Sequence, residues 1–339
     1  MKNPFSIFIT VFILVIVSPS LTAQQPYLAE TWNYSSKQIL SGLTFTDLSD
    51  TGRLSLISAG SSDGFVYALK YDGLLKWKYP GGGYVHAINA DKDRVFAAYG
   101  RNLYVLNSDG ERIGEYHGGQ LLYGASIRNI VPANFDEDED KEVALTIYDP
   151  QTCPRKKQVV GVGVTPTERI WVYEPPGNYF PLVLDAGDLD GDKVDETVTG
   201  LVARGLTQGS CTPVYDHESM IIAIDSSGEV LWEYDTDTAV TSLSVSDLDG
   251  DGIMEVIAGC YSELLIIEGD GKLKCRYDTA TRVDSLTTTQ LDGTDGLEIA
   301  FGAENLYALK NDCSLLWIGQ TGSRVYSLST GYLDGYGIR

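Results

Sequence analysis

Two nine-residue stretches of this chain place carboxylates at alternating positions. Asp188–Glu196 reads DLDGDKVDE and Asp247–Glu255 reads DLDGDGIME, each with a glycine in the turn and a glutamate at the ninth position. Proteins surround Ca²⁺ with oxygen ligands in this way: alternating side chains in a short loop, a backbone carbonyl at position seven and a later acid. The spacing therefore predicts two calcium-binding loops.

The loop pattern names the ligands that we expect. They are Asp247, Asp249, Asp251, the Ile253 carbonyl and Glu255 in one loop, and Asp188, Asp190, Asp192, the Val194 carbonyl and Glu196 in the other, with Asp195 as an adjacent possible ligand. A third copy offers Asn134, Asp136, Asp138, the Asp140 carbonyl and Glu142, and weaker copies keep Gln290, Asp292, Thr294 and Glu298, or only Asp47 and Ser49.

The predicted role of the metal is structural. Carboxylates spaced so closely repel one another unless a cation lies between them. Catalysis would need an open coordination position with a polarised water, and nothing in the pattern indicates one. We therefore expect Ca²⁺ to stabilise the fold.

The acidic loops belong to a repeat. Aligned on the second loop acid, the copies fall at Ser49, Ile88, Asp136, Asp190, Asp249, Asp292 and Asp334. A repeat of about 40 to 60 residues built from short strands is typical of β-propeller blades with four strands each. We predict an all-β, seven-bladed propeller whose seventh blade is incomplete in this chain, with blades starting near residues 40, 84, 126, 180, 239, 282 and 324.

A second recurring signal is a hairpin at the end of each repeat. Asp-Gly or Ser-Gly turns join alternating strands, as in VYALKYDGLLKWKY from Val66 and MIIAIDSSGEVLWEY from Met220. The fourth strand carries a tryptophan at one position, for which we expect packing between neighbouring blades; Cys275 replaces it in blade five. These tryptophans are Trp77, Trp171, Trp232 and Trp317.

Features outside the repeats indicate export. Residues 1–23 have a positive start, an apolar run from Phe5 to Val17 and a small-residue exit at Ala23, which predicts a cleaved signal peptide and a mature propeller domain of residues 24–339. No later segment is expected to span a membrane. The net charge of −22 disfavours nucleic acid as a partner, because such a surface repels phosphates.

The cysteines of an exported chain invite disulfides. Cys153 and Cys211 lie in two insertions that fall between the second and third strands of consecutive blades, so we expect them on one face and predict a bridge between them. For Cys260, Cys275 and Cys313 we expect free or buried thiols.

The repeats resemble two known families. The acidic loop followed by EVIAG from Glu255 resembles the FG-GAP/VCBS-type repeats of integrin-like propellers, and the hairpin with Leu-Trp after its turn resembles PQQ-like propeller repeats. The first resemblance implies calcium ligands at the loop acids and a role in adhesion or recognition. The chain lacks the adjacent cysteines of quinone-binding propellers, which argues against quinone binding.

Three functions compete. The first is a non-enzymatic, calcium-stabilised propeller, secreted or at the cell surface (periplasmic in a Gram-negative host), that binds a protein or glycan as a monomeric domain of a longer chain. The second is an enzyme acting on a polysaccharide or a redox substrate; its histidines would be His86 and His217, for which structural or solvated roles are the simpler interpretation. The third is a periplasmic assembly scaffold. The first fits best, because no catalytic set accompanies the loops.

The two ends of the chain suggest a fragment. Arg324–Leu333 begins a seventh repeat, and LDGYGIR stops where its second strand should start. Glu30–Tyr34 resembles a fourth strand and could complete that blade, which would still lack its second and third strands. We therefore expect the chain to continue beyond Arg339.

Overall fold

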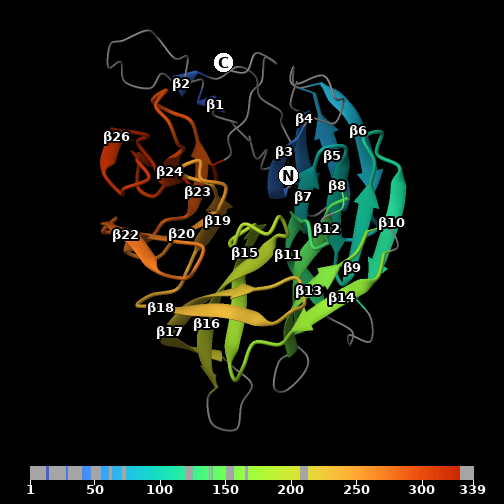
Figure 1. The fold of residues 1–339 in the computed structure, drawn as a ribbon. Helices are drawn as coiled ribbons and strands as arrows, with labels where there is room; N and C mark the ends of the chain where they lie inside the picture. The colour runs from blue at the N-terminus through green and yellow to red at the C-terminus, as the bar shows by residue number, and fades with distance from the viewer. Residues whose placement is uncertain are drawn as a thin grey trace, which may run out of the picture. The chain divides into compact units, whose positions relative to one another are not determined.

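The structure is a computed structural model. It describes residues 13–14, 28–29, 40–46, 55–60, 63–70, 74–118, 125–136, 138, 140–149, 156–164, 167–206 and 213–328. Within these ranges every regular element is a strand (Figure 1). No helix in the described ranges has the length and apolar character that crossing a membrane requires.

The strands form six four-stranded antiparallel sheets, each running through four consecutive strands of the chain. We number these sheets blade one to blade six. Blades one to three comprise β3 (Leu40–Thr46), β4 (Ser55–Gly60), β5 (Phe65–Leu69) and β6 (Leu75–Pro80); β7 (Val85–Asp91), β8 (Arg94–Tyr99), β9 (Asn102–Leu106) and β10 (Arg112–His117); and β11 (Ser126–Ala133), β12 (Glu142–Asp149), β13 (Lys156–Val162) and β14 (Arg169–Tyr173).

Blades four to six repeat this plan. They comprise β15 (Tyr179–Gly187), β16 (Glu196–Leu206), β17 (Pro213–Ile224) and β18 (Val230–Thr236); β19 (Ser242–Ser246), β20 (Glu255–Gly259), β21 (Glu263–Ile267) and β22 (Leu273–Asp278); and β23 (Ser285–Thr289), β24 (Glu298–Gly302), β25 (Leu306–Leu309) and β26 (Leu315–Gly319). Two-residue strands β1 (Ile13–Leu14) and β2 (Leu28–Ala29) pair separately.

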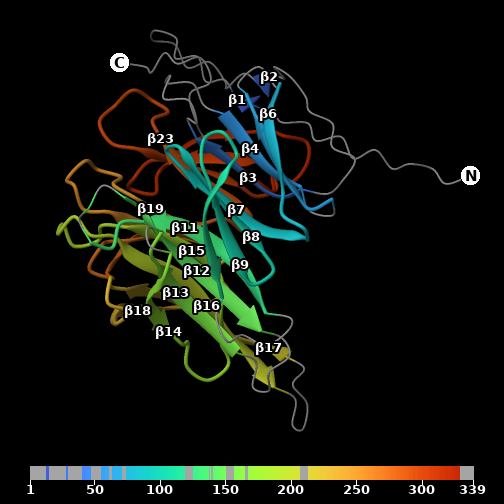
Figure 2. The same ribbon diagram turned by 90° about the vertical axis from the view of Figure 1, so that its right-hand side faces the viewer.

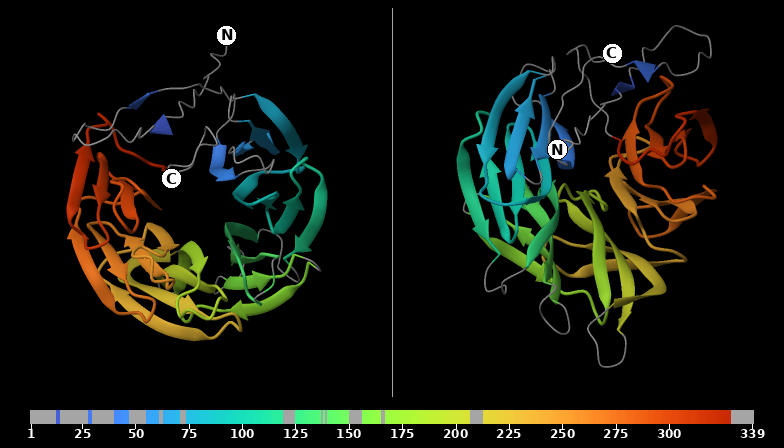
Figure 3. Two further views of the ribbon diagram at one scale, coloured as in Figure 1. Left: turned by 45° about the horizontal axis from the view of Figure 1, so that its top comes forward. Right: turned by 180° about the vertical axis from the view of Figure 1, so that it is seen from behind.

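The chain divides into two compact units, residues 1–130 with 331–339, and residues 131–330. In the first unit β7 packs against β3 and β4 (Figure 2). In the second unit β15 packs against β12 and β13, β19 against β15 and β16, and β23 against β19, so each sheet meets the preceding one through its own first strand (Figure 3). Each of these sheets therefore has the order and the neighbours of a propeller blade.

The core lies between the blades. The second and third strands of blade five, β20 and β21, are buried along their whole length, whereas the fourth strand, β22, alternates between exposed and half-buried residues. One apolar cluster joins blades four and five through Val198, Ile221, Val256 and Leu265. The strands read as continuous apolar runs in the middle of each sheet because both sheet faces are covered there.

A tryptophan–glycine contact holds neighbouring blades together and confirms the expected packing of Trp77, Trp171 and Trp232. Trp232 in β18 lies against Gly271 in the last hairpin of blade five, where an added Cβ would lie 2.8 Å from the indole Cγ. The Trp232 Nε1–H donates to the Gly269 carbonyl at 2.8 Å. Trp77 repeats both contacts in blade two, with Gly110 and the Ser108 carbonyl.

A disulfide replaces this contact between blades five and six. Cys275 in β22 takes the place of the tryptophan, Cys313 takes the place of the glycine, and the two form a disulfide with a Cα–Cα distance of 6.0 Å. Our expectation that both would be thiols was wrong, because it treated the two positions separately although they face each other. Cys260 is a free, buried thiol, as expected. Cys153 and Cys211 lie outside the described residues.

The start of the seventh repeat is only partly described. Between Gln320 and Leu328 no strand forms, but the Val325 N–H donates to the Ala303 carbonyl at 2.9 Å. Val283 makes the same bond to Cys260 where blade six begins. The segment after blade six therefore makes the same backbone hydrogen bond as the segment after blade five.

Candidate metal loops

Each acidic loop joins the first and second strands of its blade. Residues 188–195 connect β15 to β16 and residues 247–254 connect β19 to β20, so Glu196 and Glu255 are the first residues of their strands. Both glutamates are buried, whereas the aspartates before them are half-buried or exposed. The strand ends therefore fix the closing acid of each loop, and the loop backbone places the others.

In blade four the loop holds its own carboxylates in place. Asp188 accepts hydrogen bonds from Gly191 N (2.7 Å) and Lys193 N (2.8 Å), and Asp192 accepts one from Val194 N (2.8 Å). Gly191 has φ +85°, a conformation that glycine adopts without strain and that lets the loop turn here. The loop is thus wrapped with its aspartates already positioned by the backbone.

Three carboxylates converge in this loop. Oxygens of Asp188, Asp190 and Glu196 lie within 4.8 Å of one another. Burial raises the pKa of Glu196 to about 7; the charges of the loop aspartates act in the same direction, and the Leu189 N–H bond opposes them. Within the described residues no lysine or arginine pairs with Glu196. The cluster has an excess of negative charge that a cation would neutralise.

Blade three repeats the cluster with Asp136, Asp138 and Glu142, again within 4.8 Å. Glu142 accepts a bond from Phe135 N at 2.8 Å, and burial raises its pKa. The Asn134 side chain accepts a long bond from Asp136 N at 3.4 Å. The blade-three loop therefore resembles the blade-four loop in arrangement.

Asp195 does not join the blade-four cluster. Its Oδ2 accepts bonds from Asn134 N (2.7 Å) and the Lys141 ammonium (2.8 Å), both from blade three. Our expectation of an adjacent ligand is therefore corrected: Asp195 holds the neighbouring loop. Asp195 directly precedes the closing glutamate, and from this position its side chain reaches the preceding blade.

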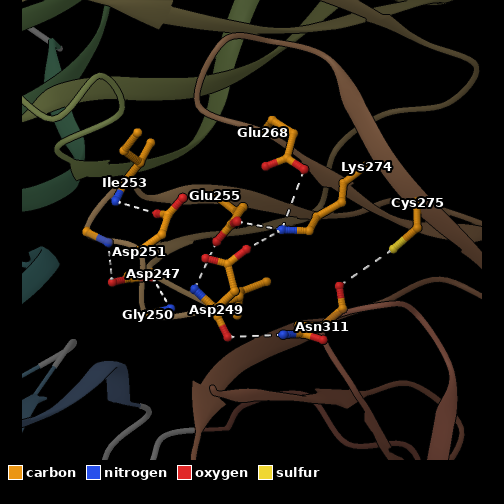
Figure 4. A network of polar contacts seen from close by, with 12 residues as sticks. Asp247, Asp249, Gly250, Asp251, Ile253, Glu255, Glu268, Lys274, Cys275 and Asn311 are labelled. Carbon is orange, nitrogen blue, oxygen red and sulfur yellow. Dashed lines mark hydrogen bonds and ion pairs between the residues drawn. The ribbon is translucent and has the colours of Figure 1, made fainter. Parts of the chain in front are cut away.

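Blade five has the same loop, but its closing glutamate is paired with a lysine. Asp247, Asp249 and Asp251 lie within 4.8 Å of one another, and Asp251 accepts from Ile253 N at 2.8 Å. The Lys274 ammonium reaches the loop from β22 and bonds Glu255 (2.7 Å) and Asp249 (2.8 Å) (Figure 4). Lys274 was missed by our sequence reasoning, which considered only residues within the loop.

The weaker copies differ more. In blade six Lys310 pairs with Asp292 at 3.0 Å, and Gln290 bonds the carbonyls of its own loop. In blade two a two-residue turn at Lys92 and Asp93 replaces the acidic loop, and Ile88 lies inside strand β7, so our alignment of Ile88 with the loop acids was wrong. Asp47 and Ser49 lie outside the described residues.

Backbone bonds link each loop to the next. Asp195 N donates to the Asn134 carbonyl (2.6 Å), Met254 N to the Asp188 carbonyl (2.9 Å) and Leu297 N to the Leu248 carbonyl (2.9 Å). Each donor precedes the closing glutamate of its blade. Whatever orders one loop therefore also positions the start of the second strand in the following blade. The carbonyl ligands at Asp140, Val194 and Ile253 remain predictions.

The histidines do not converge among the described residues. His86 lies in β7 beside Tyr84, with ring centroids 4.8 Å apart, and burial lowers its pKa. His117 lies in β10 near Asn102. The side chain of His217 is outside the described residues.

Comparisons with known proteins establish the fold. No family model matches the chain, and no curated protein matches its sequence. The chain is similar in structure to BBS1N, crystallised in complex with ARL6DN (TM-score 0.63, 11% identity, 88% of this chain and 86% of that one), and to the computationally designed Ika8 protein (0.63, 14%, 91% and 85%). It is also similar to the Dos1 propeller (0.54, 14%, 87% and 72%). The chain is a β-propeller with four-stranded blades.

Proposed function

We propose that this chain is a calcium-stabilised, non-enzymatic recognition propeller that is exported from the cell. The observation that carries the metal role is the blade-four cluster. Asp188 accepts hydrogen bonds from two of the loop's own N–H groups, and the buried Glu196 has no cationic partner in the described part of the chain. Ca²⁺ prefers such flexible carboxylate oxygens as ligands.

The proposed metal acts by supporting the blades. Extracellular calcium modules bind their ion at about 10⁻⁴ to 10⁻³ M, so outside a cell the loop would be occupied. When the free Ca²⁺ concentration is 100 times the dissociation constant of a site, binding adds about 2.7 kcal/mol to the free energy of unfolding. The bond from Met254 N to the Asp188 carbonyl extends that support to blade five.

The test is thermal unfolding of the whole chain in excess EDTA and in millimolar Ca²⁺. We expect Ca²⁺ to raise the Tm of the wild type and to raise it less in Asp188→Asn/Asp190→Asn. The control is Asp109→Asn, which removes a charge from an exposed hairpin turn and should keep the full Ca²⁺ response. An equal Tm in EDTA and Ca²⁺ for the wild type would refute the metal role.

The proposed ligand is a protein or glycan, bound by the long hairpins of blades three and four. Strands β16 and β17 are 11 and 12 residues long, and their ladder continues to the pair Leu206–Pro213. Long hairpins on a rigid scaffold are where binding residues concentrate.

A glycan array and a surface-protein panel should show a ligand whose binding is lost when residues 207–212 are replaced by a short turn. Binding that survives this replacement would mean that the ligand binds elsewhere on the chain. Turnover of a polysaccharide would favour the enzyme alternative.

A further inference from the structure

The fourth strand of every blade contains one bulged residue. In blade five Ile266 pairs with Cys275 and Ile267 with Leu273, so Lys274 is the extra residue between them. The register shifts at the same place in the other sheets, where the extra residues are Lys76, Ile113, Ile170, Leu231 and Leu316. A bulge redirects its side chain away from the regular alternation. This position is therefore equivalent throughout the repeat.

In blade five this position supplies a cation to the acidic loop. The Lys274 ammonium lies 2.7 Å from Glu255, 2.8 Å from Asp249 and 3.5 Å from Glu268, and the lysine side chain is only 22% exposed. Glu255 thus gives one oxygen to Lys274 and the other to Leu248 N. Figure 4 shows the ammonium between the carboxylates of the loop and that of Glu268, which directly follows the third strand.

Blade four has the same loop without this cation. The equivalent residue, Leu231, is apolar and 45% exposed. Glu196 here belongs to the converging carboxylate group, together with Asp188 and Asp190. Two loops of nearly identical sequence therefore differ in whether the fourth strand brings an ammonium group to the closing glutamate.

We propose that the Lys274 ammonium is the resident cation of the blade-five loop, so that this loop needs no metal ion while the blade-four loop does. The inference rests on the metal role proposed above for blade four. Loop sequence alone does not separate the two blades, because both loops carry the complete acidic pattern and only the blade-five loop receives its own counter-ion. One residue of the fourth strand then decides whether a blade depends on Ca²⁺.

The experiment exchanges the two residues. Calcium binding to the EDTA-stripped whole chain is measured by titration calorimetry for the wild type, Lys274→Leu, Leu231→Lys and the control Lys272→Leu, whose ammonium is exposed and pairs with Asp270. We expect Lys274→Leu to gain one Ca²⁺ per chain, Leu231→Lys to lose one, and Lys272→Leu to match the wild type. Unchanged stoichiometry in both exchanged variants would overturn the proposal.

Failure of the metal role gives a different result. If neither the wild type nor any variant binds Ca²⁺, the proposed metal role fails. The Tm values measured in EDTA then decide the role of Lys274. A Tm for Lys274→Leu below those of the wild type and Lys272→Leu supports a resident cation, and an unchanged Tm overturns it. Should Lys274→Leu not fold, Leu231→Lys decides: loss of one Ca²⁺, or a higher Tm in EDTA, supports the proposal, and neither change overturns it.

Discussion

At the scale of single residues, Asp185 is expected to make the stability of this protein depend on pH. Asp185 in β15 accepts hydrogen bonds from Ala186 N (3.0 Å) and from Val245 N of the next blade (2.8 Å). Burial nevertheless raises its pKa to about 7, and the charge of Asp195 adds to the effect. This carboxyl therefore retains its proton in the folded protein at pH values where it would lose it in the unfolded chain.

The direction of the pH effect follows from this difference. Between about pH 4 and pH 7 the folded state binds more protons at Asp185 than the unfolded state does, so the free energy of unfolding falls as pH rises, by at most about 1.4 kcal/mol per pH unit for this group. Urea unfolding in EDTA across this range should show a smaller slope for Asp185→Asn than for the wild type. Asp109→Asn serves as control and should keep the wild-type slope; an unchanged slope in Asp185→Asn would contradict the prediction.

Residue spacing predicted most of the acids that meet, but not what else reaches them; Asp192 and Glu255 fall outside the converging groups of their loops. Asp188, Asp190 and Glu196 are neighbours along one loop, so their spacing fixes their proximity. Lys274 comes from the fourth strand, and its approach depends on a bulge that no sequence interval reveals. Aligning the fourth strands would have shown the signal, because Lys274 stands where blades two, three, four and six have Ile or Leu and where only blade one also has a lysine, Lys76.

At the scale of elements, the last hairpin of one blade receives a side chain from the fourth strand of the blade before. The contact is Trp232–Gly271 between blades four and five, and Cys275–Cys313 between blades five and six. The hairpins and tryptophans were predictable from their turns and period. The disulfide was not, because two different residue changes had to be recognised as one pair.

Exchanging one kind of contact for the other tests this equivalence. Cys275→Ser/Cys313→Ser should lower the free energy of unfolding by about 2–4 kcal/mol, as expected for loss of a native disulfide. Cys275→Trp/Cys313→Gly should recover part of that loss by restoring the tryptophan–glycine contact. Urea unfolding measures both, and reducing agent should remove the difference in stability between the wild type and Cys275→Ser/Cys313→Ser. No recovery in the second variant would show that the two contacts are not interchangeable.

The position in the last hairpin that contacts the tryptophan of the blade before, Gly271 in blade five, requires glycine for two separate reasons. Gly271 has φ +85°, and its missing Cβ would lie 2.8 Å from the Trp232 indole. Gly293 has φ +76° but nothing within 4 Å of an added Cβ. Gly271→Ala should therefore lower the Tm clearly more than Gly293→Ala, which carries the backbone strain alone. Equal losses would mean that the indole moves aside without cost.

At the scale of the whole molecule, the period and the strand patterns were sufficient to predict a propeller. Each repeat must bury both faces of its middle strands against its neighbours, and β20, β21 and β24 do so completely. The register of blade two was not predictable, because a two-residue turn replaces its loop and the loop was the anchor of the alignment.

The bonds between consecutive loops predict how metal binding spreads. Since Met254 N donates to the Asp188 carbonyl, ordering of the blade-four loop should protect the Met254 amide in blade five. Hydrogen exchange should slow at Met254 when Ca²⁺ is added and should not slow in Asp188→Asn/Asp190→Asn. The amide of Gly110, in a hairpin of the other unit, is the internal control. Equal protection with and without Ca²⁺ would mean that the loops are ordered independently.

The bulge in each outer strand has a consequence for how such repeats diverge. A single codon at that place decides whether the side chain is aliphatic or an ammonium, while the loop beside it stays the same. If the ammonium replaces the ion as proposed, successive blades would acquire or lose their need for Ca²⁺ one at a time, and an engineer could tune the calcium dependence of a designed array by editing that codon alone.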